Sequence, residues 1–152
     1  MNETDLIKAE SGTDNNTCAC HKCKEMCKRS PCIGTPQDIL NLINNGFKEK
    51  LKFILWGAGT IYGIPLIEMV QLKQLRNGSC IMFDSQNGSC GLHDLNLKPT
   101  EGYLATCNFQ KNFESQILRG KLPSAPVIAK RWKSGTNKKT IRLIEKAMAK
   151  IT

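Results

Sequence analysis

Eight cysteines are the residues in this chain whose type and spacing point most directly to chemistry. Five of them fall within fifteen residues of one another: Cys18, Cys20, Cys23, Cys27 and Cys32. Thiolates a few residues apart suit metal chelation, because a tight turn can direct neighbouring sulfurs at one point about 2.3 Å away. Disulfides among such close neighbours would strain the backbone, and packing gives no reason for so dense a cluster. These five cysteines therefore predict a site for a soft metal.

A second group, Cys80, Cys90 and Cys107, is spread around a predicted β-hairpin and the loop after it. Each of the three lies at an expected strand end or loop edge, where a small fold can bring distant thiolates to one metal. Any one of them alone would more often be a buried apolar residue. Together the two groups offer eight sulfurs. These suit two four-thiolate zinc sites, one iron–sulfur cluster with further thiols, or one site of each kind.

The two histidines are weaker candidates than the cysteines. His21 lies inside the first cluster, and His93 follows Cys90 at a spacing compatible with zinc. Both are more typical of a surface group, or of a side chain that supports a ligand. The sequence contains no recognisable Ser–His–acid arrangement, carboxylate pair or phosphate-binding loop. Glu101 is a candidate acid–base group only if a substrate binds beside it.

The length and the N-terminal residues limit the class of protein. A chain of 152 residues has the size of one domain with a modest core. Residues 1–17 are polar and mildly acidic, which predicts a flexible leader and argues against a secretory signal peptide. No apolar run approaches the roughly 18 residues needed to span a bilayer. We therefore expect a cytoplasmic protein with reduced thiols and no membrane partner.

Capping signals predict the first element after the cysteine cluster. Thr35 is a good N-cap, Pro36 suits the first helical position, and Asp38 lies where a carboxylate meets the positive end of the helix dipole. Asn45-Gly46 is a typical helix end. The apolar residues at alternate positions in 51–55 then predict a short piece that is either helical or extended.

The remaining pattern predicts a mixed fold. Glycines in 57–63 indicate a loop that enters a buried strand, and their spacing is not that of a dinucleotide fingerprint. Residues 80–83 and 89–92 flank a strong Asn-Gly turn signal and predict a hairpin. A short helix is expected over 100–107, and 138–151 is an amphipathic helix. We therefore predict an α+β single domain with a β-hairpin and several short helices around a cysteine-ligated metal.

The net charge of +9 is concentrated near the C-terminus. From residue 110 onward eleven Lys or Arg residues accompany two Glu residues, so this segment carries the whole excess. Such a segment suits nucleic acid, acidic lipid or an acidic protein partner, and equally a solvated helix face. Trp132, between Arg131 and Lys133, is its only aromatic residue within a basic patch that could stack on a base. We divide the chain into the leader, a cysteine-cluster domain over 18–110 and a basic segment over 111–152.

The ordered series of motifs resembles a known family. The front carries Cys20, Cys23 and Cys27, then Pro31-Cys32 and Thr35-Pro36-x-Asp38; the second half carries Cys80, Cys90, Lys98-Pro99 and Cys107. This series is similar to that of the YkgJ-type cysteine-cluster proteins, and the similarity covers roughly residues 18–110. The resemblance implies a domain that chelates zinc or iron. A related cysteine-rich domain in a flagellin lysine methylase implies that this class can support iron–sulfur chemistry.

We therefore expect a zinc- or iron-chelating cysteine-cluster protein whose core is too small to be secure without its metal. The predicted ligands are Cys20, Cys23, Cys27, Cys32, Cys80, Cys90 and Cys107. The sequence leaves open whether Cys18, His21 or His93 also binds metal, and whether the protein is an enzyme. The first alternative is an iron–sulfur protein that supports redox or group-transfer chemistry. The second is a zinc module that binds nucleic acid through its basic tail.

Overall fold

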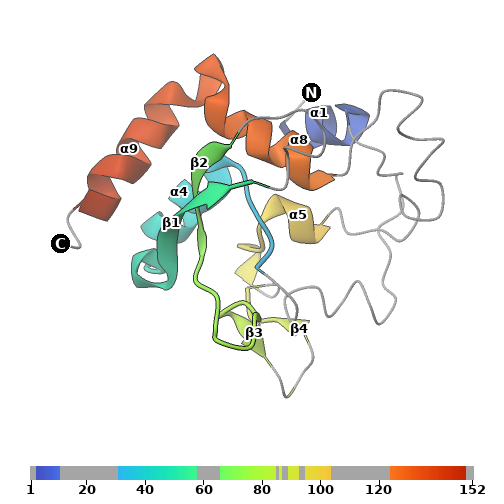
Figure 1. The fold of residues 1–152 in the computed structure, drawn as a ribbon, viewed down its shortest axis with the longest axis vertical. Coiled ribbons are helices and arrows are strands. Elements are labelled where there is room, and N and C mark those ends of the chain that lie inside the picture. The colour runs from blue at the N-terminus through green and yellow to red at the C-terminus, as the bar shows by residue number, and fades with distance from the viewer. Residues whose placement is uncertain are drawn as a thin grey trace.

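The structure is a computed structural model, and it describes residues 3–10, 31–57, 66–84, 86, 89–92, 95–103 and 124–149. These residues form a small α+β fold, as the sequence predicts (Figure 1). Its helices are α1 (Glu3–Glu10), α4 (Pro36–Asn44), α5 (Thr100–Tyr103), α8 (Ser124–Lys130) and α9 (Lys138–Ala149). Its strands are β1 (Leu51–Trp56), β2 (Ile67–Leu72), β3 (Phe83–Asp84) and β4 (Ser89–Cys90). Three short 3-10 helices complete the list: η1 (Lys48–Lys50), η4 (Arg131–Lys133) and η5 (Gly135–Asn137).

The longer hairpin consists of β1 and β2, which pair antiparallel over six residues each. The register runs from Leu51 opposite Leu72 to Trp56 opposite Ile67. The piece at 51–55, which the sequence left as helical or extended, is therefore a strand. β2 is the buried strand expected after the glycine-containing loop; four of its six residues are buried.

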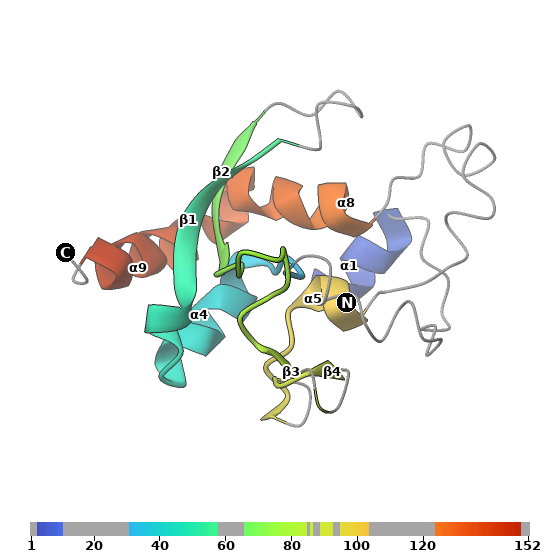
Figure 2. The same cartoon turned by 60° about the horizontal axis from the view of Figure 1, so that its bottom comes forward.

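The helical layer is built from α4, α8 and α9 (Figure 2). α4 begins at the predicted cap, where the Thr35 hydroxyl accepts a hydrogen bond from the Asp38 N–H and the Asp38 carboxylate accepts one from the Thr35 N–H. Its buried residues Ile39 and Leu42 belong to the same core as Ile144 of α9, and α4 packs against α9. The predicted apolar stripe of the last helix is thus confirmed for its described residues, because an amphipathic helix is stabilised mainly by burying that face.

The two strands of the hairpin predicted over 80–92 are present and paired, but short; the Asn-Gly dipeptide between them lies outside the described residues. β3 and β4 have two residues each, with Phe83 opposite Cys90 and Asp84 opposite Ser89. A bridge between Gln74 and Cys80 and a turn at Cys80–Phe83 take up the residues that the sequence assigned to a longer first strand. The backbone therefore turns tightly at Cys80.

The expectation of a flexible leader over residues 1–17 is wrong for residues 3–10, which form α1 and pack against α8. Ile7 is fully buried, and Glu10 pairs with Arg131 across a 3.1 Å contact. A single apolar side chain with charged neighbours is a weak sequence signal, and the partner helix lies more than a hundred residues away. The rest of the leader lies outside the described residues. No described helix is long and apolar enough to cross a membrane.

Candidate metal centre

Three of the seven predicted ligands, Cys32, Cys80 and Cys90, lie within the described residues, and all three are buried in the main core. The other predicted ligands, together with the three side chains left open, lie outside the described residues: Cys20, Cys23, Cys27 and Cys107, and Cys18, His21 and His93. Within the described part of the chain, no three His, Cys, Asp or Glu side chains gather closely enough to hold a metal ion. The complete ligand set therefore stays a prediction.

Cys80 lies in a turn whose backbone suits a thiolate. The Phe83 N–H donates to the Cys80 carbonyl oxygen at 2.9 Å and closes the turn. The Met82 N–H donates to Cys80 Sγ at 3.5 Å. This backbone donor lies within hydrogen-bond distance of the sulfur. Because Cys90 lies on β4 opposite Phe83, the hairpin also holds the second thiol beside this turn.

Cys32 is fixed through its neighbour Ile33. The Ile33 N–H donates to Glu101 Oε1 at 2.8 Å, and the Ile33 carbonyl oxygen accepts a hydrogen bond from the Glu101 N–H at 3.1 Å. Glu101 lies 68 residues further along the chain, in the first turn of α5. The two ends of the predicted metal domain are therefore joined by a pair of hydrogen bonds next to the last cysteine of the first cluster.

Asp38 forms a second junction between the same two segments. Its Oδ2 accepts hydrogen bonds from the Thr35 N–H at 3.0 Å and the Thr100 N–H at 2.9 Å, and also from the Thr100 hydroxyl. Thr35 and Thr100 are both buried, so these donors have little access to water. The sequence assigned Asp38 to the first turn of the helix and to the Thr35-Pro36-x-Asp38 motif, without a partner elsewhere in the chain. Its larger role depends on Thr100, 62 residues away.

Gly34 shows how closely the two segments approach each other. A Cβ at this position would lie 2.9 Å from Asp38 Cβ and 3.2 Å from Pro99 Cβ. The Gly34 carbonyl oxygen also accepts a 2.9 Å hydrogen bond from the indole N–H of Trp132, which is buried. The junction therefore contains both the Thr35-Pro36-x-Asp38 motif and the Lys98-Pro99 motif. Sequence reasoning named both motifs but gave no sign that they would meet.

Burial raises the pKa of Glu101 from 4.5 to about 7, and the Ile33 N–H only partly offsets this rise. Between these two values the folded chain binds more protons than the unfolded chain, so this group's contribution to stability falls as the pH rises through 7. A rise in pKa of this size corresponds to about 3 kcal/mol at most. A thiolate that binds a metal would instead contribute more stability as the pH rises. The effect of Glu101 must therefore be measured as the difference in unfolding free energy between wild type and a variant.

We expect Glu101→Gln to remove this component, because the amide keeps an oxygen for the Ile33 N–H but does not ionise. Urea unfolding of wild type and variant at pH 5.5 and pH 8 measures it. The free energy of unfolding of wild type relative to the variant should decrease from the lower to the higher pH. Glu68→Gln, at an exposed position of β2, is the matched control and should show no such change. An equal pH slope in wild type and Glu101→Gln would contradict the assignment.

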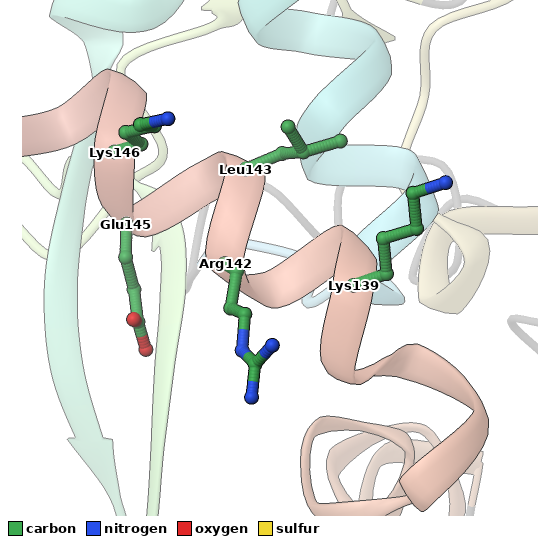
Figure 3. Close-up of a pocket in the computed structure, with 5 residues that line it drawn as sticks. All are labelled: Lys139, Arg142, Leu143, Glu145 and Lys146. Carbon is green, nitrogen blue, oxygen red and sulfur yellow. The ribbon is translucent and has the colours of Figure 1, made fainter.

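The outer face of α9 carries a separate feature, an open hollow of about 530 Å³ (Figure 3). It is lined by Lys139, Arg142, Leu143, Glu145 and Lys146, all from this one helix. Three of its five lining side chains are cations. The idea that Trp132 stacks on a nucleic-acid base is wrong, because the indole is only 7% exposed and its N–H is bonded to Gly34.

No protein-family model, curated protein or solved structure matches this chain. The resemblance to the YkgJ-type proteins therefore rests on the order and spacing of the motifs named above. The geometry adds that Asp38 of the first motif accepts hydrogen bonds from Thr100, the residue that follows Lys98-Pro99.

Proposed function

We propose that this chain is a zinc- or iron-chelating cysteine-cluster protein. One observation carries the proposal. The segment that follows Cys32 is tied by Asp38 and Glu101 to the segment that lies between Cys90 and Cys107. A chain that must hold thiolates from both of its halves at one metal needs such a junction, because ligand positions have to agree within a few tenths of an ångström.

The surroundings of the described thiols support the same proposal. Cys32 and Cys80 are 2% and 0% exposed, and the Cys80 sulfur accepts a backbone hydrogen bond. Burial keeps competing water away from a metal–thiolate bond, and hydrogen bonds to sulfur tune its charge. Under this proposal Cys20, Cys23 and Cys27 join Cys32, and Cys107 joins Cys80 and Cys90. The same thiolates suit an iron–sulfur cluster, which would give the protein a redox or group-transfer role.

A second candidate function is nucleic-acid binding through α9. The exposed cations of the described C-terminal part favour it: Lys130, Lys133, Lys138, Lys139, Arg142 and Lys146. Within the same residues 124–149, Glu145 is the single acidic side chain. A helix with this charge attracts phosphates, and binding of this kind weakens steeply as salt is raised.

Metal content and the visible spectrum of protein purified without oxygen distinguish these candidates. Colourless protein that holds one or two zinc ions supports a structural chelating site, whereas brown protein with iron and acid-labile sulfide supports the iron–sulfur alternative. We expect serine in place of Cys32, Cys80 or Cys90 to lower the bound metal. Ala129→Ser is the control and should retain the metal, because it buries a hydroxyl in α8 without removing a thiol. Metal-free protein that still folds and binds RNA with a steep salt dependence would favour the α9 candidate instead.

A further inference from the structure

The outer edge of β1 is an open strand edge with unusually apolar residues. Within the described residues β1 pairs with β2 and with no other strand. Phe53 is 56% exposed and Leu55 is 59% exposed, although both lie in the middle of a paired strand. Exposed edge strands are commonly protected by proline, bulges or several charges, because they readily pair with other chains. The sequence of β1, LKFILW, contains one lysine and no proline.

The register identifies which backbone groups point outward. The Lys73 N–H donates to the Lys50 carbonyl oxygen at 2.8 Å, so Lys50 and Lys73 stand opposite each other at a hydrogen-bonded position that continues the β1–β2 register. Residues that exchange hydrogen bonds alternate with residues that do not. Lys52, Ile54 and Trp56 therefore direct their N–H and C=O groups toward β2. The backbone groups of Leu51, Phe53 and Leu55 point to the open edge.

Of these outward groups, the Leu51 N–H is already bonded to the Lys48 carbonyl oxygen. Phe53 and Leu55, which flank Ile54, each direct both an N–H and a C=O group outward, and neither residue pairs with another described strand on that side. A second β1 strand can lie antiparallel to the first, with a two-fold axis through Ile54. Phe53 of each copy then lies opposite Leu55 of the other copy. That register satisfies two donors and two acceptors in each chain, so the edge is complementary to itself.

We propose that β1 pairs with β1 of a second copy of this chain, in this register, to form a four-stranded sheet across a two-fold axis. The side chains agree with the backbone. Aromatic and branched aliphatic residues favour such cross-strand pairs. The single charged residue of β1, Lys52, lies opposite Trp56 of the second copy, where a cation meets an aromatic face and not another cation. The interface is independent of the proposed metal site.

Charge and area set the strength of this dimer. One added strand pair gives an interface at the small end of the range, so the dimer is weak and depends on concentration. Each chain carries a net charge of +9, and repulsion between two copies opposes association. Salt screens that repulsion, so association tightens as ionic strength rises. Binding of a polyanion by the same chain would show the opposite salt dependence.

Sedimentation equilibrium of the full, metal-loaded and reduced chain tests the proposal. The average mass should rise from 16.9 kDa toward twice that value with concentration, and more so at high salt. Replacing both Phe53 and Leu55 by lysine should weaken association about tenfold or more, because it sets like charges opposite each other. The matched control replaces Leu75 and Leu95 by lysine. These leucines are 49% and 55% exposed and lie outside β1, so the control adds the same charge without changing association.

Amide hydrogen exchange supplies a measurement that does not depend on variants. The Phe53 and Leu55 amides should become protected as concentration rises, while the Ile54 amide is protected at every concentration through β2. A chain that stays monomeric throughout overturns the proposal. So does a dimer that survives the double substitution in β1, and so does protection of Phe53 and Leu55 that does not change with concentration.

Discussion

Protein stripped of metal under reducing conditions is expected to lose its cooperative thermal transition. Metal binding to a structural thiolate site contributes on the order of 10 kcal/mol to folding, which is comparable with the entire stability of a typical domain. Apart from the shared core and the Asp38–Glu101 junction, the elements around the described thiols are short. β3 and β4 have two residues each, and the segment before α4 forms its contacts through loops and caps. We therefore expect the metal to decide whether this region is ordered.

Scanning calorimetry of reduced protein with and without a strong chelator measures this effect. Adding back zinc, or iron and sulfide, should restore the transition. Cys32→Ser provides the internal comparison, because a variant that no longer holds the metal should respond little to the chelator. A transition that keeps its midpoint and enthalpy after complete metal removal would show that the core of α4, β2, α8 and α9 is stable alone. The proposed structural role of the metal would then be wrong.

Asp38→Ala is expected to destabilise the fold strongly for the loss of a single polar side chain. The change removes the acceptor for three donors and leaves the N–H of the buried Thr100 without a partner. A lost hydrogen bond to a charged group costs about 1.5–3 kcal/mol, and such losses within one cluster do not add fully. We expect a decrease of about 3 kcal/mol in the free energy of unfolding, measured in urea.

The control for Asp38→Ala is Gln37→Ala, one residue earlier in α4. The Gln37 side chain is exposed and bonds only Asn41 in the same helix, so its removal should change stability by less than about 0.5 kcal/mol. Asp38→Asn keeps one acceptor oxygen and should fall between the two. Because Asp38 joins the segments that carry Cys32 and Thr100, the alanine variant should also release metal to a chelator faster than wild type. Equal stability and equal metal release in both alanine variants would contradict the role of this junction.

Local chemistry made parts of the fold predictable. The start of α4 follows from Thr35, Pro36 and Asp38, since a capping box depends only on residues three apart. The apolar stripe of α9 follows from spacing along one helix, and the antiparallel pairing of β3 with β4 follows from two short strands close together in the sequence. Each of these predictions needs information from fewer than about fifteen residues of sequence.

Contacts between distant segments were not predictable in the same way. α1 forms because Ile7 finds a place beside α8, and no pattern within residues 1–17 indicates that partner. The tail residue Trp132 was judged by its basic neighbours, yet its indole is buried and bonded to Gly34. In each case the residue that forms the contact lies about a hundred residues or more away in the sequence. The sequence gives the types of both residues but does not indicate that they come into contact.

The same distinction between local and long-range information applies to the candidate metal site. The sequence by itself determined which side chains can bind a soft metal and that they fall into two groups, because thiolate chemistry belongs to the residue type and its spacing. Only the tertiary structure decided that Asp38 and Glu101 join the segments next to those groups, and that Glu101 is held where its pKa rises to about 7. The physical reason is that ligand chemistry is a property of single residues, whereas hydrogen bonding and burial of a carboxylate depend on what the fold places around it.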